Sequence, residues 1–515
     1  MSTVPATLNN IPVLVLGLGE SGLAIARWCA RQGAVVRVWD SRSTPPQAAA
    51  LAEELPSVVF LSGALGADTL QDAQFVFKSP GLTPHDPRMA PLLAAARAAG
   101  VPVLAELDLF AQALAALKQE RQYAPQVITI TGTNGKTTTT AMTALLVERA
   151  GRRVVMAGNI GPTLLDTLLH VLTLDEAQWP QVWVLELSSF QLQDAAPFAA
   201  DAAALLNITQ DHLDWHGDMA QYTAAKARVW AGSGAMVANA DDAAVLATVP
   251  APVINKTPRG QAPVPPRNVQ RFALTPPQRP GDWGVVTENN MAWLVRAVPL
   301  DVTVKLKSGE LEPLLLQRLM PADALLVRGR HNAANALAAL ALATSIGCAL
   351  APMLHGLREY HGEPHRVQWA GAVGDVDAFD DSKGTNVGAT VAALLGLGAD
   401  KTPARLVVIL GGDGKGQDFL PLREPLQRHA RAVALIGRDA DIIGDIVTQA
   451  GVPMQRHHSL QDAVLWCFAQ AQPGDAVLLS PACASLDMFR NYGHRAEVFV
   501  DAVRALALER GEVVA

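Results

Sequence analysis

A short loop between an expected strand and an expected helix constrains the fold of this chain most. The segment TITGTNGKTTTT spans residues 129–140 and directly follows the apolar pair Val127 and Ile128. It predicts a strand, a tight turn and a helix that opens with Lys136 and Thr137. Such a turn directs backbone N–H groups and a helix N-terminus at one place, which suits a phosphate chain. Lys136 is placed to reach the terminal phosphates, and the Thr137 hydroxyl to hold Mg²⁺.

One position departs from the strict eight-residue form of this loop. The pattern has glycine at position 130, where this chain has Ile130. A shorter loop over residues 132–137 remains. The alternative is a glycine turn that only joins strand to helix and leaves Lys136 exposed.

Composition narrows the class of protein. The formal net charge of −7 offers no basic surface for nucleic acid, so no nucleic-acid partner is expected. Four widely separated cysteines without a CxxC pair indicate a reducing compartment. Neither a signal peptide nor an apolar run of about 20 residues is evident. We therefore expect a cytoplasmic protein without membrane insertion. A monomer is also expected, although composition does not bear on this point.

Strand-like and helix-like segments alternate along the chain, which predicts an α/β fold. The length of 515 residues suggests about three domains. These are an N-terminal Rossmann-like parallel sheet (1–105), a central P-loop ATPase-type domain (106–362) and a C-terminal Rossmann-like domain (363–515). The expected strands lie at residues 12–16, 35–39, 58–61, 75–77 and 101–104, then 128–131, 154–156, 182–187 and 203–207, and finally 378–380, 406–410, 432–436 and 476–479.

The central domain is expected to carry an insertion near residues 250–325. Residues 250–280 are rich in Pro, Arg and Gln and predict a loop. Beside this loop we expect a small antiparallel patch with strands at 291–295, 302–307 and 324–327. The following segment 332–346 is almost entirely alanine and leucine, which predicts a helix buried on most sides.

The N-terminal segment GLGESG (17–22) follows an expected strand and opens an expected helix, and Asp40 ends the next strand. This arrangement matches a dinucleotide fingerprint, with glycines for the turn and an acid for the ribose. It indicates a nucleotide or diphosphate site. The alternative is a glycine turn that serves only the packing of sheet and helix.

Polar groups follow several strand ends of the central domain. Glu186 ends an expected strand, at the sheet edge where ligands bind, so its carboxylate would complete an oxygen shell around Mg²⁺. The alternative is an exposed strand-end glutamate. In NITQDHLD, His212 is a candidate for metal or phosphate contact, while Asp211 has a helix cap as its simpler role. Composition alone leaves Lys226 a surface lysine, and leaves Asn332 undecided between helix cap and ligand.

Three loops of the last domain follow expected strands. They read DDSKGTN (380–386), GGDGK (411–415) and SPACASLD (480–487). Their serines and N–H groups would act as donors and their lysines as point charges, which indicates a site for a small carboxylate ligand. The alternative is three ordinary turns.

Taken together and in order, these segments resemble the Mur ligases of bacterial cell-wall synthesis over nearly the whole chain. The matching set is GLGESG, GTNGKTT, GNIG, ELSSFQL, NITQDHLD, AAKAR, HNAANALAA, EPHR, DDSKGTN, GGDGK and SPACASLDMF. SSFQL and the last motif favour the member that adds D-glutamate. The resemblance implies ATP-dependent addition of D-glutamate to UDP-N-acetylmuramoyl-L-alanine through an acyl phosphate, with Mg²⁺ and with the third domain closing around residues 361–366.

The resemblance also implies a role for each matching residue. ATP would be bound by Gly132, Thr133, Asn134, Gly135, Lys136, Thr137, Thr138, Asn332, Arg366, Asp381 and Lys383. The catalytic set would be Lys136, Glu186, His212 and Lys226, and the metal ligands Thr137, Glu186, His212 and Lys226, the last converted to an anionic carbamate. The UDP substrate would contact Ser21, Ser41, Arg42, Asn159 and His212. D-glutamate would contact Thr385, Lys415, Ser485, Leu486 and Tyr492.

Some positions depart from the pattern of the family. Tyr492 stands where phenylalanine is expected, and Trp215 stands where arginine is usual. Glu20 is acidic at a position where the resemblance implies a small or apolar residue next to the uracil of the substrate. Two alternatives remain, a Mur-type ligase for another amino acid and a nucleotide-binding protein without catalysis. The adders of diaminopimelate or lysine should carry an Asn-Pro-Arg motif, which this chain lacks. Loss of catalysis would require loss of Glu186, His212 or Lys226, and all three are present.

Overall fold

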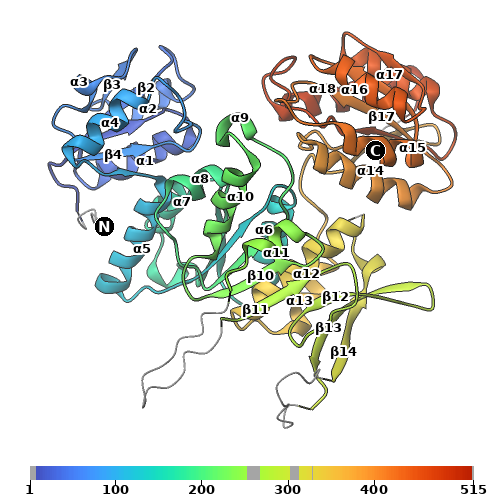
Figure 1. Cartoon of the computed structure of the whole chain (residues 1–515), viewed down its shortest axis with the longest axis horizontal. Helices are drawn as coiled ribbons and strands as arrows, with labels where there is room; N and C mark the ends of the chain where they lie inside the picture. Colours follow the sequence, from blue (N-terminus) through green and yellow to red (C-terminus); the bar gives the residue numbers. More distant parts are fainter. Residues whose placement is uncertain (1–6, 252–266, 302–312, 328, 513–515) are drawn as a thin grey trace.

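The computed structural model describes residues 7–251, 267–301, 313–327 and 329–512. Figure 1 shows the N-terminal domain in blue and the C-terminal domain in orange, on either side of the central domain, which runs from cyan to yellow. Each domain is built on its own sheet with helices packed against it. The expectation of three α/β domains is confirmed.

The N-terminal sheet is parallel and has the order β3-β2-β1-β4-β5. Its strands all lie within two residues of the expected segments. They are β1 (Pro12–Leu16), β2 (Val35–Asp40), β3 (Val59–Ser62), β4 (Phe75–Lys78) and β5 (Val103–Leu104). The helices are α1 (Glu20–Arg31), α2 (Ala48–Glu54), α3 (Ala67–Leu70) and α4 (Ala90–Ala99).

The central sheet has nine strands in the order β14-β13-β12-β11-β10-β9-β6-β8-β7. The parallel strands are β6 (Gln126–Thr131), β7 (Val154–Gly158), β8 (Val182–Glu186), β9 (Ala202–Leu205), β10 (Ala235–Asn239), β11 (Val269–Phe272) and β12 (Trp283–Glu288), followed by the antiparallel β13 (Met291–Pro299) and β14 (Leu314–Pro321). The helices are α5 (Glu106–Arg121), α6 (Lys136–Arg149), α7 (Leu164–Val171), α8 (Ser189–Asp194), α9 (Leu213–His216), α10 (Met219–Ala227), α11 (Ala243–Thr248), α12 (Arg330–Ser345) and α13 (Leu350–Leu357).

Two expectations for the inserted region are wrong. The predicted loop 250–280 contains the four-residue strand β11. Its side chains alternate in burial, but four residues beside a proline-rich segment are too few for a strand pattern to be recognised in the sequence. The third antiparallel strand is β14 and not 324–327, because Ala324 ends the short 3₁₀ helix Ala322–Ala324 and residues 325–327 are not in a strand. The expected strand 302–307 lies outside the described residues.

The C-terminal sheet has the order β15-β16-β20-β17-β18-β19, parallel except for the β15–β16 hairpin. Its strands are β15 (Gln368–Val373), β16 (Val376–Asp380), β17 (Leu406–Gly411), β18 (Ala430–Ile436), β19 (Met454–Arg456) and β20 (Ala476–Leu479). The helices are α14 (Val387–Lys401), α15 (Arg423–His429), α16 (Ala440–Gln449), α17 (Leu460–Gln470) and α18 (Tyr492–Glu509). The edge strands β15 and β19 were not predicted.

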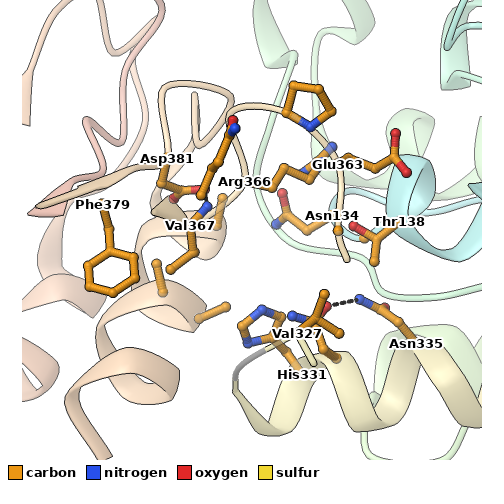
Figure 2. A pocket seen from close by; sticks show the side chains of 18 of the residues that line it. Asn134, Thr138, Val327, His331, Asn335, Glu363, Arg366, Val367, Phe379 and Asp381 are labelled. Atoms are coloured by element: carbon orange, nitrogen blue, oxygen red, sulfur yellow. Dashed lines mark hydrogen bonds between the residues drawn. The ribbon is translucent and has the colours of Figure 1, made fainter. Parts of the chain in front are cut away.

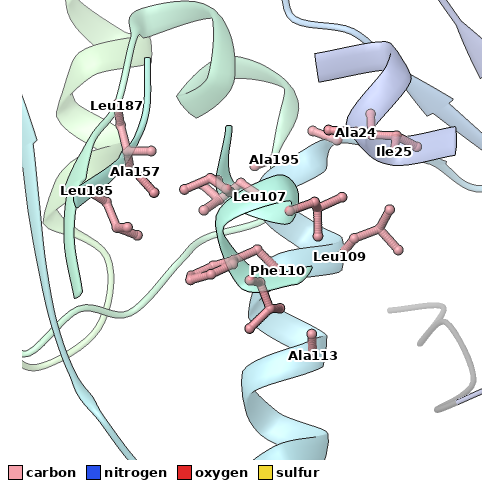
Figure 3. Close-up of a cluster of buried hydrophobic side chains, with 14 of the residues drawn as sticks. Ala24, Ile25, Leu107, Leu109, Phe110, Ala113, Ala157, Leu185, Leu187 and Ala195 are labelled. Atoms are coloured by element: carbon pink, nitrogen blue, oxygen red, sulfur yellow. The ribbon is translucent and has the colours of Figure 1, made fainter. Parts of the chain in front are cut away.

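The two junctions between domains differ in chemistry. Figure 3 shows side chains of α1, α5 and the central strands in one buried apolar cluster, so the first two domains share a core. The apolar clusters of the C-terminal domain contain only its own residues among those described. Hydrogen bonds join it to the central domain, including Arg366 to Thr137 (3.1 Å) and Asp418 N to Gln210 Oε1 (3.1 Å). A dry junction is expected to hold its domains together, whereas a polar one allows closing and opening.

Candidate active site

The phosphate loop joins the end of β6 to the start of α6. Ile130 is fully buried in β6, paired with β8 on one side and β9 on the other. This position belongs to the strand, where a β-branched residue packs well, and the loop begins at Gly132. Gly135 precedes α6 with a φ of +80°, and a Cβ there would lie 2.7 Å from Asn335 Oδ1. Both conformation and space therefore require glycine at position 135.

The structure brings the first residues of α6 together with the hinge of the third domain. Lys136 Nζ donates to the carbonyl oxygens of Gly132 (2.9 Å) and Thr133 (2.8 Å), and burial lowers the pKa of this ammonium group. Arg366 Nη2 donates to the buried Thr137 hydroxyl over 3.1 Å. Three residues predicted to hold ATP thus lie in one place.

Glu186 and Lys226 lie buried beside the phosphate loop. Glu186 ends β8 and is 1% exposed; its Oε1 accepts a hydrogen bond from Asn159 Nδ2 (2.7 Å), while its buried Oε2 has no hydrogen-bond partner. Lys226 Nζ donates to Gly132 O over 2.8 Å. Burial, and next to it the charge of Lys136, lowers the pKa of the Lys226 amine well below its usual value. Lys226 is therefore not the surface lysine that composition alone suggested.

His212 and Asp211 precede α9. The His212 ring packs edge-on against Phe190 at 4.7 Å, and burial lowers its pKa to about 4, against the opposing charge of Asp211, whose Oδ2 is 3.5 Å from Nε2. The ring is accordingly neutral near pH 7, and one of its two nitrogens carries a free lone pair instead of a proton. His212 itself occupies the N-cap position, so the helix-cap role considered for Asp211 is wrong.

Asp211 is a site residue that sequence reasoning missed. Its carboxylate is 6% exposed and accepts a hydrogen bond from Asn386 Nδ2 over 3.2 Å. Its charge also raises the pKa values of Lys136 and Lys226, opposing the effect of burial. The motif NITQDHLD contained the signal, because an acid next to a histidine after a strand end lies at the same sheet edge as Glu186.

A cavity of about 530 Å³ lies between the phosphate loop, α12 and the third domain. Figure 2 shows His331 and Asn335 of α12 on one side and Arg366, Val367 and Asp381 on the other. Asn332 also lines the cavity, and Asn335 Nδ2 donates to its Oδ1 over 3.1 Å. His331 and Asn335 were not predicted as site residues, although both belong to the matching segment HNAANALAA. Burial lowers the pKa of His331 to about 4, so this ring is neutral as well.

Asp381 and Lys383 follow β16. Asp381 Oδ2 accepts a hydrogen bond from Ser480 Oγ (2.6 Å), and burial raises the pKa of the carboxyl to about 7. Burial lowers the pKa of Lys383, whose ammonium lies 5.6 Å from the centre of the Tyr492 ring. Lys383 also interacts electrostatically with Glu186, which places the predicted nucleotide and metal residues near one another.

The three loops considered for a carboxylate ligand all lie at the carboxyl edge of the C-terminal sheet. Two of them are joined directly, because Asp413 N donates to Ala484 O (3.0 Å) and Ala484 N donates to Asp413 O (2.8 Å). Lys415 interacts electrostatically with His212 across the domain boundary. Ser485 is buried, whereas Leu486 is 72% exposed and available for a ligand or a moving domain.

The residues predicted for the UDP end lie around the glycine loop of the first domain. Asp40 accepts a hydrogen bond from Leu18 N (2.8 Å) and pairs with Arg42 at 2.8 Å, so its carboxylate ties the two loops to each other. The Ser21 hydroxyl donates to the buried Glu106 at the start of α5. Ser41 is exposed beside them. These residues belong to a different domain from Lys136, and the substrate would have to span both.

Known families match all three domains. The Mur ligase MurD-like N-terminal domain matches residues 12–105, the Mur ligase middle domain residues 130–257, and the Mur ligase glutamate ligase domain residues 365–483. Solved structures of similar fold include MurC of Thermotoga maritima (TM-score 0.54, 20% identity, 96% of this chain and 100% of that one). Another is MurF ligase of Thermotoga maritima in complex with ADP (TM-score 0.56, 15% identity, 98% and 96%).

Full-length relatives are much more similar in sequence. The UDP-N-acetylmuramoylalanine--D-glutamate ligase of Albidiferax ferrireducens is 57% identical over 98% of this chain and 98% of its own length. The ligase of the same name from Burkholderia pseudomallei is 55% identical over 97% and 98%. On this evidence the chain belongs to the Mur ligase family, among the UDP-N-acetylmuramoylalanine--D-glutamate ligases.

Proposed function

We propose that this protein uses ATP to join D-glutamate to UDP-N-acetylmuramoyl-L-alanine in the synthesis of peptidoglycan precursors. The observation that carries the proposal is one buried cluster at the sheet edge, in which Lys136, Glu186 and Lys226 meet Arg366 of the third domain. Relatives at 49–57% identity named for this reaction support the same conclusion.

The reaction has two steps. A carboxylate oxygen of the alanyl group attacks the γ-phosphorus of ATP, the bond to ADP breaks, and an acyl phosphate forms. The D-glutamate amine then attacks the acyl carbon, phosphate leaves and the amine loses a proton. Lys136 and Arg366 offset negative charge on the transferring phosphoryl group, and the loop N–H groups orient it. This work is mainly positioning, which suits a site on rigid strand ends.

The donor set suits Mg²⁺ once Lys226 is modified. The unpartnered Glu186 Oε2, the neutral His212 and the Thr137 hydroxyl can each offer a lone pair. No three histidine, cysteine or carboxylate side chains gather as metal ligands within the described ranges, and an anionic group on Lys226 would add an oxygen ligand to this set. A neutral Lys226 amine can add CO₂ and release a proton, giving a carbamate. Bound there, Mg²⁺ would neutralise phosphate charge.

The remaining assignments rest on the resemblance to the Mur ligases, and the lining of the cavity supports those for the nucleotide. The cavity lined by Asn134, Thr138, Asn332, Arg366 and Asp381 would hold the nucleotide, with Gly132, Thr133, Gly135 and Lys383 around it. Thr385, Lys415, Ser485, Leu486 and Tyr492 would receive D-glutamate, and Ser21, Ser41, Arg42, Asn159 and His212 the UDP substrate.

All four cysteines are buried and free, which fits a reducing compartment. This supports a cytoplasmic site of action. Across the described residues, every helix falls short of the length and apolar character that a membrane-spanning segment needs.

The decisive assay is ADP release by the purified protein with UDP-N-acetylmuramoyl-L-alanine, ATP and Mg²⁺. We expect release that depends on D-glutamate and is near background with L-glutamate, L-lysine or diaminopimelate. Release with one of these other amino acids but not with D-glutamate would indicate a different Mur-type ligase. No release with any of them would indicate a nucleotide-binding protein without catalysis.

A further inference from the structure

Two asparagines from different domains form a reciprocal pair of side-chain hydrogen bonds. Asn386 Nδ2 donates to Asn134 Oδ1 (2.9 Å), and Asn134 Nδ2 donates to Asn386 Oδ1 (3.1 Å). Asn134 belongs to the phosphate loop and Asn386 precedes α14 of the third domain. The pair therefore connects the loop expected to hold ATP with the segment that carries Thr385.

The orientation of the Asn386 amide is determined by its other bonds. Its Oδ1 also accepts a hydrogen bond from Ala389 N (2.9 Å), as the N-cap of α14, and a backbone N–H can only meet the oxygen. The amide nitrogen must then face Asn134 Oδ1 and Asp211 Oδ2, the latter at 3.2 Å. The Asn386 side chain is 4% exposed, so its hydrogen bonds to Asn134, Asp211 and Ala389 form inside the junction between the domains.

The backbone of Asn134 is also fixed by a pair of hydrogen bonds. Asn134 N donates to Asn207 Oδ1 (2.7 Å), and Asn207 Nδ2 donates back to Asn134 O (3.0 Å). Asp211, the other acceptor of Asn386, raises the pKa values of Lys136 and Lys226 against the effect of burial. The Asn386 amide therefore contacts both the phosphate loop and a carboxylate that acts on the two lysines.

The first turn of α14 lies too close to the central domain for a side chain. A Cβ on Gly388 would lie 2.8 Å from Thr209 Oγ1 and 3.0 Å from Asn134 Nδ2. Glycine inside a helix is otherwise unfavourable compared with alanine. The close approach of the two domains at this point accounts for its presence.

We propose that the Asn134–Asn386 pair is the contact that holds the third domain closed on the phosphate loop, with Asn386 as a positioning residue for the amino acid. Opening the junction exposes the two amides and Asp211 to water, and closing it restores their mutual bonds, so the pair favours the closed state. Closure brings Thr385 to the acyl phosphate. That last step rests on the proposed function, whereas the closing contact itself does not.

Spin labels on exposed positions of two domains measure closure directly. Cysteines introduced by Glu148→Cys and Gln449→Cys are exposed, whereas all four native cysteines are buried. Distances between the labels are recorded with and without adenylyl imidodiphosphate and Mg²⁺. We expect a closed population in the parent protein that falls about fivefold or more in Asn134→Ala, Asn386→Ser and Gly388→Ala.

The variants separate closure from stability of the fold. Asn386→Ser keeps a helix-capping oxygen but is too short to reach Asn134, and Gly388→Ala should not weaken α14. The double variant Asn134→Ala/Asn386→Ser should be no more open than either single variant. Ser459→Ala, which removes the N-cap of α17 in the same domain, is the matched control and should close normally.

Turnover gives a second, independent measure. In Asn386→Ser the KM for D-glutamate should rise about fivefold or more, whereas in Ser459→Ala it should stay within about twofold of the parent value. The proposal is overturned if Asn386→Ser and Gly388→Ala keep the parent distance distribution, if the single effects simply add, or if the parent protein has no closed population. Failure of the parent protein to use D-glutamate would instead overturn the proposed function, and the label distances would still decide on the pair.

Discussion

Lys136 and Lys226 donate hydrogen bonds to the same carbonyl oxygen, that of Gly132, over 2.9 and 2.8 Å. Two ammonium groups on one oxygen repel each other, and a carbonyl has only two lone pairs to offer. Lys226 is the more deeply buried of the two, and the charge of Lys136 lowers its pKa further. Of the two lysines, Lys226 is therefore the one whose neutral amine form is favoured more strongly.

Replacing Lys226 by alanine should lower turnover by about 100-fold or more, because the carbamate that we propose at this position would be lost, and with it a ligand for Mg²⁺. Short carboxylic acids should restore part of the ADP release, since they can occupy the same space with the same charge. Lys118→Ala, on the exposed end of α5, is the control and should behave as the parent. No restoration at any concentration of carboxylate would count against the carbamate.

Replacing Lys136 by alanine should abolish formation of the acyl phosphate and leave the fold intact. The ammonium makes only two hydrogen bonds to its own loop, each of which contributes about 1 kcal/mol to stability. Hydroxylamine converts an acyl phosphate to a hydroxamate, which can be measured without D-glutamate, and circular dichroism checks the fold. Near-normal hydroxamate formation would contradict the assignment of the ATP site.

The strand ends and their polar residues were largely predictable, because both depend on local pattern. Apolar runs followed by glycine or polar residues indicate parallel strands, and parallel strands present their carboxyl ends at one edge. That rule brings Glu186 and the phosphate loop together without any knowledge of the fold. The short edge strand β19 was not predicted, because its three side chains are all exposed and form no apolar pattern.

Contacts between distant parts of the chain could not be predicted in the same way. Asn134 and Asn386 are 252 residues apart, and neither stands out from other polar residues in its loop. Trp215, which replaces the usual arginine, packs against Phe190 at 4.7 Å and lies under Lys78, whose Nζ is 5.6 Å from its ring. Its place is explained by an aromatic cluster that only tertiary structure reveals.

Glu106 should make the stability of the protein depend on pH. Burial raises the pKa of this carboxyl to about 7, although Leu165 N (3.0 Å) donates to it. The folded state then holds more protons than the unfolded state between about pH 4.5 and pH 7, so stability falls as pH rises through that range. The loss is on the order of 3 kcal/mol above pH 7. Thermal unfolding of Glu106→Gln should show a smaller fall than the parent, and the remainder is expected from Asp381, whose pKa burial also raises to about 7.

The control for Glu106 is Glu148→Gln, an exposed glutamate on α6. Its unfolding should follow the parent across the same pH range. Equal pH dependence in Glu106→Gln and in the parent would show that Glu106 does not titrate there.

Replacing Gly135 by alanine should weaken nucleotide binding far more than it weakens the fold. The φ of +80° costs an alanine about 1–2 kcal/mol, and its Cβ would also meet Asn335 Oδ1 at 2.7 Å, whose amide is held by Asn332. Gly151 has the same conformation, with a φ of +82°, but open space around it. Gly151→Ala should therefore lower the melting temperature by a similar amount and leave ADP affinity unchanged by titration calorimetry. In Gly135→Ala the affinity should fall about tenfold or more, because the clash displaces the N–H groups that face the phosphates. Equal ADP affinity in the two variants would mean that the contact with Asn335 does not shape the loop.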